Sequence, residues 1–222
     1  MITEQQLVTV IDEVKSSMKK RKFTQTLELI MVFKDIDVKK GFAINDILEL
    51  PKQSKSPALV CVMASGDMSL KARDAKADKV LNEEELVKFE SNKRESRKFI
   101  NKYDFFLADT KLMPTVGKIL GQLMGPRGKM PTPVPFNASI ESLLKRFRSS
   151  IRIRVRTSLS LSCKFGDESM DTGDLAANAL VIINSVIRKL PNAERNMRKI
   201  LIKASMSKAI KLEVVQRKKS HV

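Results

Sequence analysis

A dense glycine and proline stretch, LMGPRGKMPTPVP at residues 123–135, holds two isolated cations, Arg127 and Lys129. A glycine followed by lysine is part of the phosphate-binding loop pattern G-x-x-x-x-G-K-[ST]. Here Leu123 replaces the first glycine, and Met130 replaces the hydroxyl that would bind magnesium. The stretch is therefore not a nucleotide-binding loop. Two interpretations stay open: a rigid connector at one end of a sheet, or a platform that presents both cations to an RNA backbone.

Few residues of this chain could support catalysis or metal binding. Cys61 and Cys163 lie in apolar, strand-like patterns, so we expect buried free thiols. The single histidine, His221, is next to the last residue. These three residues do not make a zinc site of known spacing, and no histidine is placed to activate a nucleophile. We expect no enzyme activity, no metal and no cofactor.

The charge balance points to a polyanionic partner. The 222 residues contain 42 Lys and Arg against 25 Asp and Glu, a net charge of +17. A charge this large repels itself unless a polyanion offsets it, so RNA or DNA is favoured and an anionic membrane is a distant second. No apolar run approaches the roughly 20 residues that span a bilayer, and the polar, acidic N-terminus does not resemble a signal peptide. We expect a cytoplasmic protein without a membrane partner.

The first part of the chain predicts a helix, two strands and a linker. Apolar residues at helical spacing indicate a helix over 3–20, closed by the basic run KKRK at 19–22, which either caps the helix or contacts RNA. Residues 24–36 and 41–50 are typical of strands, and PKQSKSP at 51–57 is typical of a linker.

The middle of the chain, residues 58–149, has a different pattern. Short apolar runs such as ALVCVMA and YDFFLAD alternate with helical stretches, and a serine-capped helix is expected over 139–150. Apolar strands that alternate with helices predict a parallel sheet covered on both faces.

The last third begins with a strictly alternating segment, IRIRVRTSLSLSCKF at 151–165. Period two predicts an antiparallel strand or a hairpin with one buried and one solvated face. The side chains of the solvated face can donate hydrogen bonds to phosphate oxygens: Arg152, Arg154, Arg156, Ser158, Ser160, Ser162 and Lys164. A helix over 174–190 and two strands follow. Net charge is +2 over 1–57, +6 over 58–149 and +9 over 150–222.

Several motifs carry a family resemblance. GPRGKMPTPVP, preceded by YDFFLADTKLMPTVGKILGQLM, resembles the signature of the universal large-subunit ribosomal "L-one" family in its archaeal form. FTQTLEL, from residue 23, and KASMSKAIKL, from residue 203, are similar to that family's first and last strands. The resemblance extends over nearly the whole chain.

The resemblance implies a mixed α/β and α+β fold with two domains. Residues 1–57 and 150–222 would form a split α+β sandwich that binds ribosomal RNA. Residues 58–149 would form an inserted Rossmann-like three-layer α/β domain.

The resemblance also implies the ribosomal RNA contacts. Phe23 and Met206 would press on sugar faces, and Glu28 would accept from a 2′-hydroxyl. Ser207 and Lys208 replace the family's usual glycine and proline. They either disturb a close approach to RNA or add a hydroxyl donor and a phosphate contact. The expected RNA-binding set is Lys22, Phe23, Thr24, Glu28, Lys164, Ser205, Met206, Ser207 and Lys208.

The implied function is structural. The protein would be a monomer within the large ribosomal subunit, at the head of the mobile stalk. There it would bind ribosomal RNA, assist release of deacylated tRNA from the exit site, and repress translation of its own mRNA. The inserted domain, with Arg127, Lys129 and the KRESRK helix at 93–98, would touch tRNA. Two alternatives are a phosphosubstrate enzyme with a Rossmann-like domain and a sequence-tolerant DNA-binding module.

Overall fold

The computed structural model describes all residues except 1, 38–41, 137, 157 and 213–222, so the predicted basic tail and His221 lie outside the described residues. The chain divides into two compact units. The outer unit comprises Met1–Ser56 and Ser150–Val222, and the inserted unit comprises Pro57–Ser149. The mixed fold class expected from the sequence is confirmed by the elements of the two units.

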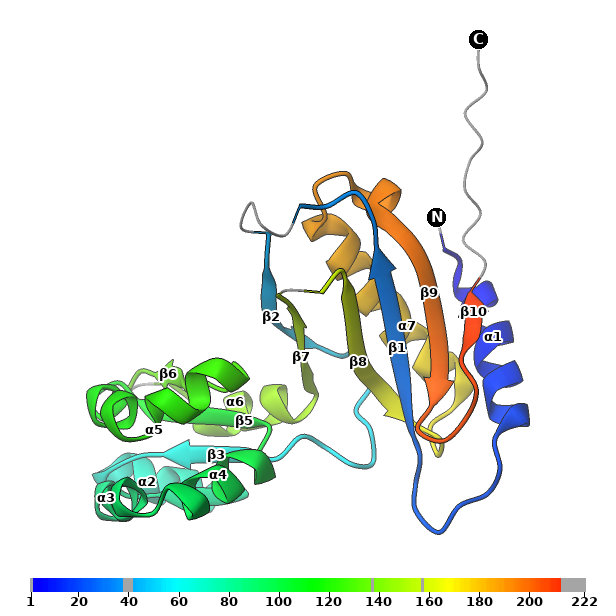
Figure 1. The fold of residues 1–222 in the computed structure, drawn as a ribbon. Coiled ribbons are helices and arrows are strands. Elements are labelled where there is room, and N and C mark those ends of the chain that lie inside the picture. Colours follow the sequence, from blue (N-terminus) through cyan, green and yellow to red (C-terminus); the bar gives the residue numbers. More distant parts are fainter. Residues whose placement is uncertain (1, 38–41, 137, 157, 213–222) are drawn as a thin grey trace. The chain divides into compact units, whose positions relative to one another are not determined.

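The outer unit contains a four-stranded antiparallel sheet in the order β10-β9-β1-β8 and a two-stranded antiparallel sheet, β2-β7 (Figure 1). Strands from the two ends of the chain are neighbours in both sheets, so the outer unit forms only when the ends meet. In chain order the elements are α1 (Glu4–Ser17), β1 (Thr26–Phe33), β2 (Ile44–Glu49), β7 (Ser150–Val155), β8 (Ser160–Asp167), α7 (Thr172–Lys189), η2 (Ala193–Asn196), β9 (Met197–Ala204) and β10 (Ile210–Leu212).

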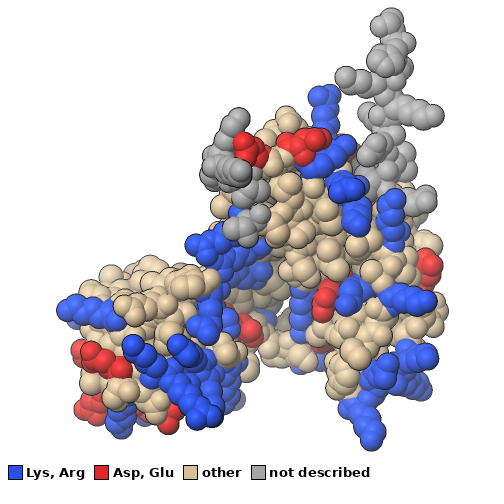
Figure 2. Space-filling model, in the orientation of Figure 1, with Lys and Arg blue, Asp and Glu red and all other residues tan. Residues whose placement is uncertain are grey.

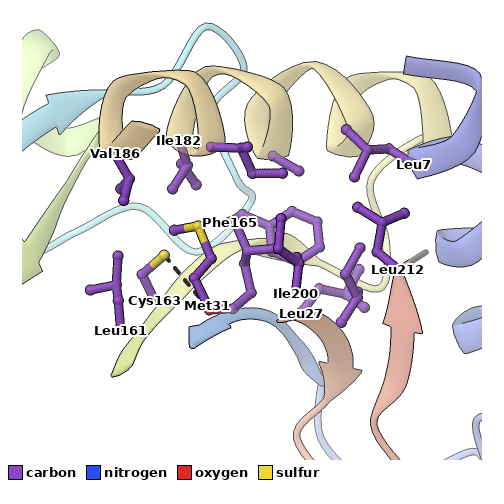
Figure 3. Packing of buried hydrophobic residues seen from close by; sticks show 14 of the residues in the cluster. Leu7, Leu27, Met31, Leu161, Cys163, Phe165, Ile182, Val186, Ile200 and Leu212 are labelled. Atoms are coloured by element: carbon purple, nitrogen blue, oxygen red, sulfur yellow. Dashed lines mark hydrogen bonds between the residues drawn. The ribbon is translucent and has the colours of Figure 1, made fainter. Parts of the chain in front are cut away.

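The core of the outer unit lies between the larger sheet and the helices α1 and α7 (Figure 3). Alternate residues of β1, such as Leu27 and Met31, are fully buried there, with Leu7 of α1 and Ile182 of α7. The intervening residues of β1 are only half-buried, because the period of two turns them to the opposite face of the sheet. That opposite face is where the expected contact Glu28 lies.

The alternating segment at 151–165 forms two strands that belong to different sheets. β7 pairs with β2, and β8 pairs with β1. The expectation of one continuous strand, or of a hairpin whose strands pair with each other, is therefore wrong. The alternation keeps its phase from one sheet to the next, so the pattern alone does not reveal the change of partner.

The inserted unit contains a parallel sheet in the order β4-β3-β5-β6, as the alternation of strands and helices predicts. Every residue of β3 and β5 is buried, because helices cover both faces. Phe106 packs in the core with α3, α4 and α5, whereas Phe105 contacts Phe147 of α6. The elements are β3 (Val60–Met63), α2 (Gly66–Asp74), β4 (Lys79–Leu81), α3 (Glu83–Ser91), α4 (Lys93–Lys102), β5 (Phe105–Asp109), α5 (Met113–Arg127), β6 (Thr132–Val134) and α6 (Ile140–Arg148). Ser139 caps α6 as expected.

The glycine and proline stretch at 123–135 is not a single connector. Its first residues complete helix α5, which ends at Gly128 with a φ of 69°. The amides of Gly128 and Lys129 donate to the carbonyls of Gly125 and Met124, a Schellman arrangement that requires a left-handed residue. Its last residues form β6, an edge strand, where a proline is tolerated because only one side of the strand is paired. The stretch therefore ends a helix and begins an edge strand.

Candidate nucleic-acid interface

Two exposed apolar side chains mark the expected interface of the outer unit. The exposed fraction is 52% for Phe23, which precedes β1, and 61% for Met206, in the turn between β9 and β10. The two segments are neighbours, because the Ser205 amide donates to the Thr26 carbonyl at 3.0 Å. Water solvates neither side chain well, so each gains by covering an apolar partner surface such as a sugar or base face.

The buried side chain of Gln25 holds this region together. Its Nε2 donates to the Lys19 carbonyl at 3.1 Å and to Glu168 Oε2 at 3.3 Å. Its Oε1 accepts from the Met206 amide at 3.3 Å. One side chain, 1% exposed, thus joins the segment before β1, the turn after β8 and the turn after β9. Sequence reasoning missed Gln25, although a polar residue in register with the buried positions of β1 was a usable signal.

The hydroxyl groups of Ser205 and Ser207 form hydrogen bonds that hold the turn between β9 and β10. Ser205 Oγ lies 2.8 Å from Thr26 Oγ1 and accepts from the Thr26 amide at 3.2 Å. Ser207 Oγ accepts from the Ala204 amide at 2.8 Å, and the Ser207 amide donates to the Ala204 carbonyl at 3.1 Å. Both serines position the turn that exposes Met206, and contact with RNA stays a prediction for both.

The replacement of glycine by Ser207 is compatible with the backbone. Among the described residues, the non-glycine positions with positive φ are Asp35, Lys76 and Ala193. Ser207 therefore does not adopt the left-handed conformation that favours glycine. Its side chain forms the hydrogen bonds that close the turn.

Glu28 lies between two lysines on the open face of the larger sheet. Its register partners are Lys164 on β8 and Lys203 on β9. Opposite charges on neighbouring strands stabilise the sheet modestly. All three side chains are half-buried, so a carboxylate stands between cations on a surface that a ligand can reach.

Lys164 also has a structural role in the outer unit. Its ammonium donates to the Ser56 carbonyl at 3.2 Å and lies 3.2 Å from Asp167 Oδ1. Asp167 is 1% exposed and also accepts from Ser54 Oγ and from the Ser56 amide. This cluster fixes residues 54–56, which are part of the predicted linker at 51–57, and Asp167 is a second residue that sequence reasoning missed.

The basic run KKRK does not close helix α1. The helix ends at Ser17, and its last turn contains Lys15 instead. Residues 19–22 are exposed in the connection to β1, so the expectation that they cap the helix is wrong. Lys22 and Thr24 flank Phe23, and Lys208 follows the turn; all three are exposed. Exposed cations therefore lie close in sequence to both apolar side chains, Lys22 beside Phe23 and Lys208 two residues after Met206.

The side chains on the predicted solvated face of 151–165 differ in how exposed they are. Arg156, Ser158, Ser160 and Ser162 are exposed, whereas Arg152 and Arg154 are half-buried. Burial, and then the neighbouring charge of Arg154, lower the pKa of Arg152. The exposed members are the better placed to meet phosphates.

Arg127 and Lys129 lie in the inserted unit and both bind main-chain carbonyls. Arg127 Nη1 donates to the Leu123 carbonyl at 2.9 Å. Lys129 Nζ donates to the carbonyls of Ile100 and Tyr103, at 3.0 and 2.6 Å, where α4 ends. Lys129 thus ties the end of α4 to the end of α5. Their contact with RNA stays a prediction.

The thiols are poor nucleophiles in this fold. Cys61 and Cys163 are free and buried, as the sequence predicts. Burial raises the pKa of Cys61 far above its usual range and that of Cys163 to about 12. Among the described residues, no group of three His, Cys, Asp or Glu side chains could hold a metal ion. Nor does the described part of the chain contain a helix with the length and apolarity needed to cross a bilayer.

Known proteins similar to this chain include archaeal ribosomal proteins. The model of the ribosomal protein L1p/L10e family matches residues 14–208. A large ribosomal subunit protein uL1 from Cenarchaeum symbiosum is 61% identical over 211 residues, 95% of this chain and 97% of the relative. Proteins of the same name are 41% identical in Thermofilum pendens, over 91% of each chain, and 34% identical in Archaeoglobus fulgidus, over 96% of this chain and 99% of the relative.

Proposed function

Because the chain belongs to the ribosomal protein L1p/L10e family, we propose that the segments around Phe23 and Met206 form its ribosomal RNA-binding patch. The family is structural and non-enzymatic, so the chain is a large-subunit ribosomal protein, located on cytoplasmic ribosomes, that binds ribosomal RNA. This removes the phosphosubstrate enzyme as an alternative. The patch comprises Lys22, Phe23, Thr24, Glu28, Lys164, Ser205, Met206, Ser207 and Lys208.

The observation that carries this proposal is the set of buried hydrogen bonds of Gln25, which hold the segments that expose the apolar side chains. Gln25 is buried and hydrogen-bonded to three segments, so the Met206 backbone is held before any ligand arrives. A preorganised site loses little conformational entropy on binding, which favours affinity and specificity. The surrounding exposed lysines add attraction for phosphates, which is independent of sequence.

Glu28 is proposed to recognise RNA as opposed to DNA. A carboxylate repels phosphates, so its presence among cations favours a ligand group that donates a hydrogen bond. The ribose 2′-hydroxyl is such a donor, and it is the group that distinguishes RNA from DNA. This assignment also separates the proposal from a sequence-tolerant DNA-binding module.

Binding to a stalk fragment of ribosomal RNA and to its DNA counterpart tests the proposal. The wild-type chain should bind the RNA at least about 100-fold more tightly, which corresponds to about 2.7 kcal/mol. Glu28→Ala should reduce this ratio about tenfold, and Glu13→Ala, which removes an exposed carboxylate from α1, should leave it unchanged. Equal affinity of the wild-type chain for both nucleic acids would refute the proposal.

We further propose that the protein is the head of the mobile stalk, where it helps deacylated tRNA leave the exit site. The same patch would bind the protein's own mRNA and repress its translation. Repression requires only that the mRNA present the sugar and backbone geometry of the ribosomal site. Excess protein should reduce expression of a reporter that carries the protein's own leader sequence, and the Phe23→Ala/Met206→Ala variant should not. Equal repression by both proteins would contradict the shared site.

A further inference from the structure

Helix α4 of the inserted unit places all of its lysines and arginines on one exposed face, which we call the α4 face. Its residues are Lys93, Arg94, Arg97, Lys98 and Lys102. At about 100° per residue, these five positions cover one half of the helix circumference. Ser96 and Ile100 are buried on the other half. Figure 2 shows Lys and Arg side chains gathered at the position of α4 in Figure 1.

This arrangement opposes the stability of the helix itself. Lys93 and Arg94 lie in the first turn, where the helix dipole favours anions. Lys93 and Arg97 are four residues apart, as are Arg94 and Lys98, and like charges at that spacing repel. Glu95 is the one acidic residue of α4, so five cations stand against one carboxylate, whereas a helix selected only for stability or solubility would mix the two signs more evenly. The α4 face therefore fits a partner that neutralises it.

The protein does not supply that partner in its described residues. None of the five cations of the α4 face forms an ion pair with a carboxylate there. Lys102 lies over the ring of Tyr103, 5.6 Å from its centroid. Three acidic residues of the neighbouring α3 lie in that helix's own first turn, where Glu85 pairs with Lys79, and the fourth, Glu90, forms no ion pair with the α4 face. The cations of the α4 face are thus available to a ligand.

The density of charge matches a nucleic-acid strand. Ten residues of helix extend about 15 Å, so the α4 face carries about one cation per 3 Å of axis. One strand of a duplex carries about one phosphate per 3.4 Å. Five cations spaced over this length of one helix face therefore suit a row of phosphates better than a single anion.

We propose that the α4 face binds the phosphate backbone of a folded RNA, separately from the ribosomal RNA-binding patch of the outer unit. Asn101 is the uncharged polar residue at the centre of this face, and the face presents no aromatic side chain for stacking. Contacts to base edges would be needed to read sequence. Binding at the α4 face is therefore tolerant of sequence and strongly dependent on salt.

The test uses the full chain and a short RNA duplex that lacks the stalk sequence. The α4 variant is Lys93→Gln/Arg94→Gln/Arg97→Gln/Lys98→Gln. The control variant removes the same charge from four dispersed exposed positions of the inserted unit, Arg73→Gln/Lys88→Gln/Lys111→Gln/Lys145→Gln. Duplex affinity is measured at several salt concentrations, and circular dichroism verifies that each variant is folded.

The α4 variant should lose at least about tenfold in duplex affinity at low salt, and its log–log salt slope should fall by about three. The control should lose less than about threefold. A Met206→Ala variant should keep duplex binding while stalk RNA binding falls, which separates this inference from the function proposed for the patch. Equal losses in the two charge variants, unchanged duplex affinity of the α4 variant, or α4-dependent binding to anionic lipid vesicles without RNA binding would overturn the proposal.

Discussion

In the outer unit, the proposed RNA contacts stand on a network of buried hydrogen bonds, whereas in the inserted unit the α4 face is a set of exposed cations on one helix. The first arrangement fixes Met206 through Gln25 and Ser205 and limits the shapes that fit. The second attracts any phosphate backbone at low salt. Positioned contacts can discriminate among RNAs, and a row of charges mainly increases affinity. The two surfaces should therefore respond differently to mutation and to salt.

Loss of the buried hydrogen bonds of Gln25 should have the largest effect on stability and on RNA affinity. Gln25→Leu leaves the Met206 amide without its acceptor and the Lys19 carbonyl without its donor. We expect a loss of about 1–3 kcal/mol in the free energy of unfolding and a 10- to 100-fold loss of stalk RNA affinity, about 1.4–2.7 kcal/mol. Denaturant unfolding and RNA titration measure the two effects. Gln122→Leu, on the exposed side of α5, is the control and should change neither quantity. A Gln25→Leu chain with wild-type RNA affinity would contradict the role proposed for Gln25.

The next largest effect should be confined to the core of the outer unit. A Cβ at Gly166 would clash with Leu175 Cδ2 and lie 2.9 Å from Met170 Sδ. Gly166→Ala should therefore destabilise the outer unit by about 1–3 kcal/mol. Hydrogen exchange should detect this in β8 and α7, while β3 and β5 keep their protection, because each unit has its own core.

The matched control for Gly166 is Gly117 in α5. A Cβ there meets no atom within 4 Å, so Gly117→Ala should stabilise the inserted unit by up to about 1 kcal/mol. If Gly166→Ala lowered protection equally in both units, the separation of the two cores would be wrong.

A variant of Lys129 can distinguish a structural role of this residue from contact with RNA. Lys129→Met removes the two hydrogen bonds at the end of α4 and should destabilise the inserted unit by about 1–2 kcal/mol. Thermal unfolding measures this loss, and stalk RNA affinity should stay within about twofold of wild type, equivalent to about 0.4 kcal/mol. A stable variant that binds RNA weakly would instead assign Lys129 to the interface.

The smallest effect should come from an ion pair of the outer unit, Asp46 with Lys189, that belongs to neither surface. The hydrogen bond from Lys189 lowers the pKa of Asp46 below its ordinary value of 3.8. The carboxylate form therefore stabilises the fold above that value, and the stabilisation is lost as the pH falls through the folded-state pKa. Because the pair is exposed, Asp46→Asn should cost less than about 1 kcal/mol near neutral pH. Unfolding curves at neutral and acidic pH should converge for the two proteins, and a difference that persisted in acid would contradict this assignment.

The sequence predicted the strands and helices well where periodicity and burial agree. The alternation of β1 and the uniformly apolar β5 correspond to one covered face and two covered faces respectively. Local patterns were misleading where a segment changes partner. The alternation at 151–165 crosses from one sheet to another, and the glycine and proline stretch divides between α5 and β6.

The residues that carry the site could be predicted only in part. Phe23 and Met206 came from the family resemblance, and their exposure agrees with a contact role. Gln25 and Asp167 were missed because their partners, such as Met206 and Ser56, are distant in sequence and meet only in the fold. The role of Ser207 likewise depends on the turn that its own hydroxyl closes.

The salt dependence of stalk RNA binding by the Phe23→Ala/Met206→Ala variant tests the central claim most directly. If apolar contacts from segments held by the hydrogen bonds of Gln25 provide specificity, the variant should bind stalk RNA at least about 100-fold more weakly, equivalent to about 2.7 kcal/mol, at every salt concentration. Its log–log salt slope should equal that of the wild-type chain, because no cation is removed. A variant that kept wild-type affinity, or whose loss disappeared at low salt, would contradict the claim.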